Sequence, residues 1–112
     1  MIFINFKTYK EGSGEKAIDL VKIIEEVSEE TQIKIIPVVQ ATDIKEIAGS
    51  SKLEIWAQSV SFEDYGAHTG AILPEAVSED GALGTFLNHS EIKLSDFDKL
   101  EATVKRAKEV DL

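Results

Sequence analysis

Four polar residues in succession, Asn88, His89, Ser90 and Glu91, follow the short apolar run at 85–87. In a parallel α/β protein the carboxyl ends of the strands face the ligand, so a polar cluster at such a position is a candidate for chemistry. His89 is one of two histidines in the chain, and an imidazole with an ordinary pKa of about 6.5 can serve as acid, base or neutral electrophile. The segment also fits an ordinary strand-to-helix connection, because Asn, Ser and Glu favour helix starts.

A second polar cluster follows the apolar run at the N-terminus. In the stretch 2–7, Asn5 and Lys7 alternate with apolar residues, and the period of two along a strand puts both side chains on one face. A lysine at a strand end is usually solvated, whereas beside a strand end that carries a histidine it becomes a candidate for binding an anion. We therefore expect Asn5, Lys7 and His89 to contribute to one site.

The elements that must position these residues alternate along the chain. Sequence patterns predict helices at 15–31, 43–48 and 73–80. A closing helix is predicted to begin with a capping box at 95–98, with Ser95 as the cap and Asp98 at the third position, and its inner stripe begins at Phe97. Short β-branched runs predict strands at 2–7, 33–39 and 53–58, and a fourth opening near 84. Four strand–helix pairs in succession indicate a parallel sheet with right-handed crossovers, so we expect one α/β domain over residues 1–112.

The connection at 59–72 is long for a strand-to-helix loop, and loops of that length in compact domains are usually functional or binding. Its glycines and Tyr65 favour a protruding, defined loop. A surface position is the simpler interpretation of His68 in that loop. The large apolar surface of Trp56 favours a place in the core over a place at a ligand.

Four segments together resemble one known family. Asn5-Phe6-Lys7, Trp56-Ala57-Gln58 and the stretches 66–70 and 88–91 occur in the order, and at spacings compatible with, triosephosphate isomerase in its short, archaeal-type form. The resemblance covers the whole chain but half of the family's (βα)8 TIM barrel. It implies a parallel (βα)4 half-barrel, the N-terminal half of the enzyme that interconverts dihydroxyacetone phosphate and glyceraldehyde 3-phosphate in glycolysis and gluconeogenesis.

The resemblance implies a role for each matched residue. Lys7 would hold the anionic substrate and offset developing negative charge, and His89 would polarise the substrate carbonyl. Asn5 would position the substrate, while Glu91 would flank Lys7 and Ser90 would pack near the base. The implied substrate is a phosphorylated triose, with no metal and no cofactor.

Thr69 lies in what the resemblance identifies as the family's dimerisation loop, where it would reach toward Asn5 and Lys7 of the neighbouring subunit. The family's glutamate base and phosphate-binding turns belong to later strands and have no counterpart in this sequence. We expect little or no activity from the chain alone, since losing one acid–base group typically costs about 100- to 10,000-fold. The expected partner is a complementary C-terminal half-barrel or a second copy in a homo-oligomer.

Three interpretations stay open: one half of a split isomerase, a catalytically silent half-barrel that self-associates for binding or assembly, and a truncated part of a longer gene product. The sequence stops at Leu112, between the fourth helix and the place of a fifth strand, which favours the expectation of a natural half-barrel. An open four-stranded sheet leaves two edges and one apolar face that a partner must cover.

Composition limits the expected partners and compartment. With 12 basic against 21 acidic residues and a net charge of −9, the chain is not expected to bind nucleic acid or anionic membranes. It has no cysteine, so neither a disulfide nor a thiolate metal site can form. The N-terminal stretch lacks a basic segment followed by a long apolar one, so we expect no secretion signal, no membrane span and a cytoplasmic protein.

Overall fold

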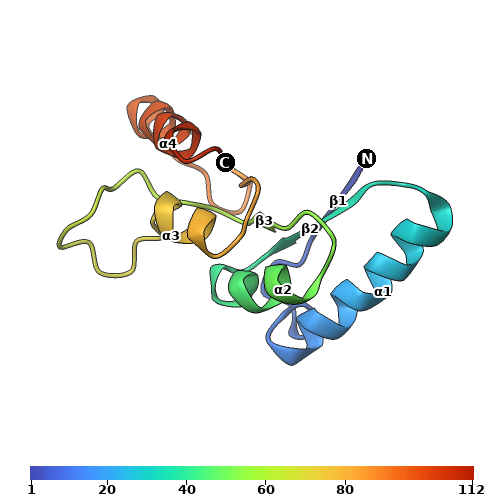
Figure 1. The fold of residues 1–112 in the computed structure, drawn as a ribbon. Helices are drawn as coiled ribbons and strands as arrows, with labels where there is room; N and C mark the ends of the chain where they lie inside the picture. The colour runs from blue at the N-terminus through green and yellow to red at the C-terminus, as the bar shows by residue number, and fades with distance from the viewer.

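Parallel strands and helices alternate along the chain in the computed structural model, which describes residues 1–112 (Figure 1). Strands β1 (Ile2–Asn5), β2 (Ile35–Val39) and β3 (Trp56–Ala57) form one sheet in that order. Asn5 pairs with Val38, which in turn pairs with Trp56. Because all strands are parallel, their carboxyl ends lie at the same end of the sheet.

All four strands are shorter than predicted: β1 ends at residue 5 instead of 7, and β2 begins at residue 35 instead of 33. β3 spans two residues instead of 53–58, and the fourth segment forms one isolated bridge between Thr85 and Ala57. The segment still follows β3, because the Ala57 N–H donates to the Gly84 carbonyl and the Phe86 N–H to the Ala57 carbonyl, each at 2.9 Å. A segment that contains a glycine and has no neighbour on its far side has few contacts to keep it extended.

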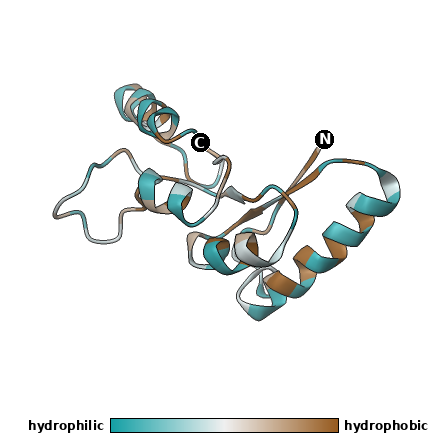
Figure 2. Cartoon of the chain, in the orientation of Figure 1, coloured by the Kyte–Doolittle hydropathy of each residue, from teal (hydrophilic) through white to brown (hydrophobic).

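Four α-helices and two 3-10 turns follow the strands. The helices are α1 (Glu15–Thr31), α2 (Ile44–Ser50), α3 (Pro74–Glu79) and α4 (Phe97–Glu109), and the 3-10 turns are η1 (Lys10–Gly12) and η2 (Ala41–Asp43). Hydrophilic and hydrophobic bands alternate along α1 (Figure 2), as the helical spacing of its apolar residues predicts. No helix combines the length and the apolar character that crossing a membrane would require.

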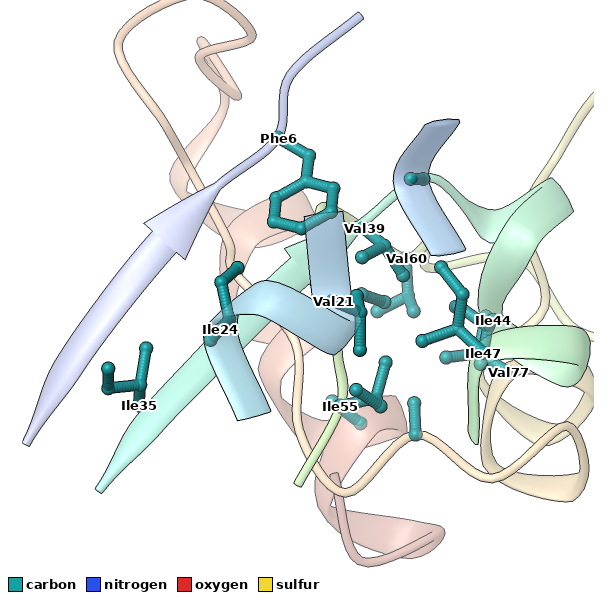
Figure 3. Packing of buried hydrophobic residues seen from close by; sticks show 14 residues of the cluster. Phe6, Val21, Ile24, Ile35, Val39, Ile44, Ile47, Ile55, Val60 and Val77 are labelled. Atoms are coloured by element: carbon teal, nitrogen blue, oxygen red, sulfur yellow. The ribbon is translucent and has the colours of Figure 1, made fainter. Parts of the chain in front are cut away.

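The main core lies between the sheet and the helices (Figure 3). Its members are all at most 7% exposed. The strand side contributes Phe6, Ile35, Val39, Ile55 and Ala57, and the helices contribute Ala17, Val21, Ile24, Ile44, Ile47, Val77 and Ala107. Burying one such aliphatic side chain contributes about 1.5–3 kcal/mol before the entropy cost of ordering the chain. This packing fixes the strands in an order that brings their carboxyl ends together.

An aromatic cluster covers the opposite face of the sheet. Phe3 alternates with Phe6 and so points away from the helices, where its ring packs against those of Trp56 and Phe86, with centroids 4.9 and 5.6 Å away. The Trp56 indole N–H donates to Glu54 Oε1 at 2.8 Å. Hydrogen bonds from Lys34 and Trp56 hold the pKa of Glu54 below its usual range. Trp56 therefore packs among other aromatic side chains, but it is half-buried and lies outside the main core in which its apolar surface predicts it.

The start of α4 differs from the sequence prediction. Asp96 is the N-cap, and its Oδ1 accepts a hydrogen bond from the Asp98 N–H at 2.9 Å, so Ser95 lies one residue outside the cap. Phe97, the predicted first member of the inner stripe, is 76% exposed. The most buried position of the helix is Thr103. The buried residues of α4 are therefore Thr103 and Ala107, which are smaller than the phenylalanine predicted to begin its inner stripe.

Candidate active site

Lys7 lies just past the carboxyl end of β1 in a backbone conformation that is rare for a residue with a side chain. Its φ is 49°, in the left-handed region that costs a non-glycine residue of order 1 kcal/mol. Two hydrogen bonds hold it there: the Lys7 N–H donates to Asn5 Oδ1 at 2.9 Å, and Gln58 Nε2 donates to the Lys7 carbonyl at 2.8 Å. Side chains from the ends of β1 and β3 thus fix the direction of the lysine.

His89 follows the fourth segment in a tight turn. The Ile92 N–H donates to the His89 carbonyl at 2.9 Å. Asn88, with φ 55°, also lies in the left-handed region, and its Oδ1 accepts from the Leu94 N–H at 2.9 Å. The asparagine therefore closes the loop that presents the imidazole. No helix begins here, so the cluster at 88–91 is not the ordinary helix start that its residue types also allowed.

The two strand ends meet through an ion pair. Lys7 Nζ lies 2.8 Å from Glu91 Oε1, with side chains 34% and 57% exposed. The hydrogen bond with Glu91 and the charge of its carboxylate raise the pKa of Lys7, and the same hydrogen bond lowers the pKa of Glu91. Both groups are therefore charged at neutral pH, and the ammonium is held at the mouth of the site.

The imidazole of His89 is oriented by the backbone. The Glu91 N–H donates to His89 Nδ1 at 3.2 Å, and Glu91 Oε2 lies 3.6 Å from the same nitrogen. Because Nδ1 accepts this hydrogen bond, a neutral His89 carries its proton on Nε2. The ring can then offer an N–H donor from Nε2 to an oxygen in the site.

These side chains line one pocket of about 210 Å³. All but one of its lining residues carry a polar or charged side chain: they are Asn5, Lys7, Thr8, Gln58, Ser59, His89, Glu91 and Ile92. The size suits a small polar or anionic molecule. No group of three or more His, Cys, Asp or Glu side chains is placed to hold a metal ion.

Most of the sequence-predicted site residues are brought together here, and two are not. Asn5, Lys7, His89 and Glu91 share the pocket, whereas Ser90 is exposed in the turn beside it and does not line it. Thr69 lies in the exposed part of the long loop, which projects away from the sheet (Figure 1). Sequence reasoning did not assign a role to Gln58, although its place at the end of the third predicted strand was a usable signal.

Comparison of the sequence with known proteins gives one family, and comparison of the structure gives a matching fold. A family model of triosephosphate isomerase matches residues 1–112. The chain is 43% identical to the triosephosphate isomerases of Methanobacterium bryantii and of Saccharolobus solfataricus, over all of this chain and 49% of each relative. The crystal structure of triosephosphate isomerase from Bartonella henselae matches with a TM-score of 0.82 at 22% identity, over all of this chain and 47% of that one.

The structural match concerns the fold: the parallel sheet and its helices correspond to half of a TIM barrel. The chain spans about half the length of the curated relatives it matches. Because the family model covers the chain from its first residue to its last, the chain belongs to the triosephosphate isomerase family.

Proposed function

We propose that this chain supplies one half of a triosephosphate isomerase active site, for the interconversion of dihydroxyacetone phosphate and glyceraldehyde 3-phosphate. One observation carries the proposal. The ends of the first and fourth segments meet in a single polar pocket, with Lys7 Nζ 2.8 Å from Glu91 and His89 oriented by the Glu91 amide. In this family the reaction moves a proton between adjacent carbons through an enediolate, with a neutral histidine and a glutamate base.

In the proposed mechanism, Lys7 binds the substrate anion and offsets the negative charge that develops on the enediolate oxygens. A cation held in place before the reaction stabilises such charge without reorganisation at the moment of proton transfer. The hydrogen bonds to the backbone of Lys7 and the ion pair with Glu91 supply that preorganisation. The net charge of −9 makes this local cation important, because the chain as a whole repels anions.

His89 is the proposed electrophile. With Nδ1 occupied by the Glu91 amide, its Nε2–H is the group that would polarise the substrate carbonyl and then donate to the enediolate. Asn5 would position the substrate beside Lys7. Ser90, which is exposed next to the imidazole, would pack near the catalytic base. Glu91 contributes two contacts to the site: its carboxylate forms an ion pair with Lys7, and its backbone N–H orients His89.

The proposed catalytic base and the phosphate-binding turns come from outside residues 1–112. The relatives are about twice as long as this chain, and the resemblance assigns both features to the later strands. We therefore propose that turnover needs a complementary C-terminal half-barrel. Removal of a general base alone typically costs about 100- to 10,000-fold in rate.

The test is an isomerase assay of the purified chain with and without the C-terminal half of the Methanobacterium bryantii relative, supplied as a separate polypeptide. We expect activity only on mixing. Lys7→Met and His89→Gln should each lower the activity of the mixture at least about 100-fold, while Lys10→Met, which removes a lysine outside the pocket, should not. A stable complex of the two halves with no activity, or full activity in both pocket variants, would refute the proposal.

A second candidate function is a catalytically silent half-barrel that self-associates for binding or assembly. The observation in its favour is the exposed apolar surface at both open edges of the sheet, where Ile2 is 47% and Leu83 61% exposed. Edges of this kind favour pairing with another chain. A well-folded homo-oligomer that ignores the added C-terminal half and stays inactive would favour this candidate.

A further inference from the structure

Arg106 on α4 gathers carboxylates from three segments of the chain. Its Nη2 lies 2.6 Å from Glu75 Oε1 and 3.4 Å from Asp64 Oδ1, and its Nη1 lies 3.1 Å from Glu109 Oε2. The arginine side chain is only 16% exposed. Glu109 belongs to the same helix, but the other two carboxylates flank the long loop between β3 and α3: Asp64 lies on its first limb, and Glu75 lies in the first turn of α3, where the second limb ends.

The loop between these two carboxylates is closed at its base and free beyond it. At the base, the Ser61 N–H donates to the Ile72 carbonyl at 2.8 Å, and the Ile72 N–H donates to Ser61 Oγ at 2.9 Å. Among hydrogen bonds and ion pairs, the contact between Asp64 and Arg106 is the one that ties residues 62–70 to another element. Lys99 adds a cation–π contact to the Phe62 ring at 5.7 Å.

The carboxylate of Asp64 also binds the backbone of the loop. Its Oδ1 faces Arg106 and also accepts a hydrogen bond from the Tyr65 N–H at 2.7 Å. The carboxylate therefore fixes the direction in which the chain leaves residue 64. On the other side, the pair with Glu75, whose side chain is 18% exposed, holds the guanidinium in place, and the planar fork of arginine can reach both carboxylates at once.

We propose that Arg106 is the positioning residue of the loop 62–71, which it holds by Asp64 on one limb and by Glu75 at the foot of the other. Stability is a weaker explanation, because Glu75 Oε2 and Arg106 Nε are buried without hydrogen-bond partners. An incompletely satisfied buried ion pair contributes little net stability. The proposal rests in part on the proposed function, since Thr69, which the family resemblance makes a subunit contact, lies on this loop. The role of Arg106 within the chain does not depend on that function.

Hydrogen–deuterium exchange of the full chain tests the proposal. Asp64→Asn removes the charge but keeps an oxygen for the Tyr65 N–H, so it isolates the ionic link. Within 64–70 the amides that donate a hydrogen bond are those of Tyr65 and His68. We expect these two amides to exchange about two- to fivefold faster, the range for an ion pair of this exposure, while amides of α1 and α4 keep their rates. Arg106→Met should accelerate the same amides. Lys105→Met, which removes a neighbouring charge with no ion pair from the same helix, should change nothing.

Unchanged exchange of the loop amides in Asp64→Asn would overturn the proposal. If Arg106→Met does not fold, the result for Asp64→Asn is sufficient to test the proposal. Equal acceleration across the loop and α4 would also overturn it, because that pattern means general destabilisation. Sedimentation of the same variants separates the two claims. If the wild-type chain is monomeric, the proposed contact through Thr69 fails, whereas faster loop exchange in Asp64→Asn still supports the role of Arg106.

Discussion

Replacing Gly84 with alanine should destabilise the fold and displace the segment that carries His89. A Cβ atom at position 84 would lie 2.2 Å from Cε2 and 2.5 Å from Cδ2 of the Trp56 indole. The ring cannot easily turn aside, because its N–H is bound to Glu54 at 2.8 Å and its edge packs against Phe3. Gly84 is not among the residues with positive φ, so the backbone conformation suits alanine and the cost is steric.

The size of the effect follows from the overlap. The nearest ring atom must retreat by about 1.2 Å to reach 3.4 Å, the lower limit of ordinary contact. Overpacking a fitted site typically costs about 1–3 kcal/mol, and we expect the upper end because Trp56 is held on two sides. With a urea m-value of about 1.2 kcal/mol/M, a loss of about 3 kcal/mol lowers the unfolding midpoint by about 2.5 M.

Urea unfolding followed by far-UV circular dichroism measures this change. Gly49→Ala is the matched control, since the same methyl group in α2 meets no atom within 4 Å. There, alanine should raise the unfolding free energy by up to about 1 kcal/mol, because it favours a helix more than glycine does. The double variant Gly84→Ala, Trp56→Leu tests the cause: a smaller side chain at 56 relieves the overlap, so the two changes should be strongly non-additive.

Two results would refute this reasoning. A midpoint for Gly84→Ala within about 0.5 M of the wild type would mean that the ring has room to move at little cost. Additive effects of Gly84→Ala and Trp56→Leu would mean that the methyl group clashes somewhere other than the indole. Either result would remove the argument that the close contact of Gly84 with Trp56 sets the position of the segment leading to His89.

Three further predictions concern the site and the last helix. Because the hydrogen bond from Lys7 lowers the pKa of Glu91 in the fold, the pair stabilises the fold above the unfolded-state pKa of about 4.3. This contribution is lost as the pH falls through the folded-state pKa. A carbon-13 titration of Glu91 should show the lowered pKa in the wild type and an ordinary one in Lys7→Met. Asp96→Ala should cost about 1 kcal/mol in chemical unfolding, while Ser95→Ala costs under about 0.5 kcal/mol, because the N-cap is Asp96. Gln58→Leu leaves the Lys7 carbonyl without its partner and should lower the activity of the complemented enzyme about tenfold with a loss of about 1 kcal/mol in stability.

The meeting of the two strand ends could be predicted because it depends on strand order. Parallel order puts every carboxyl end at the same end of the sheet, and that step needs no knowledge of the packing. The alternation argument for Lys7 does not hold, because Lys7 lies beyond β1 with a φ of 49°. The structure places Lys7 and Glu91, 84 positions apart in sequence, in one ion pair.

The backbone details could not be predicted because they depend on tertiary contacts. Nothing local marks Lys7 for a φ of 49°, which is held by the side chain of Gln58, a residue 51 positions away. The β-branched and aromatic residues of the fourth segment predict a strand, yet the segment forms one bridge. The reason is that β-propensity depends on neighbouring strands, and an edge segment has a neighbour on one side only. At the start of α4, both Ser95 and Asp96 are good cap residues, and local sequence does not decide between them.

The ion pair also bears on how the half-barrel keeps its shape. β1 and the fourth segment are the two outer members of the four-segment sheet, so the contact between Lys7 and Glu91 joins its edges across the face that carries the Phe3 and Trp56 rings. The 2.8 Å separates Lys7 Nζ from Glu91 Oε1, two side-chain atoms of residues that lie beyond the strands. The rings of Phe3 and Phe86, which belong to the same two outer members, also meet, with centroids 5.6 Å apart. These contacts fit a curved sheet. Curvature is in turn supported by aromatic packing within residues 1–112, so the site geometry should persist without a C-terminal half, while turnover should not.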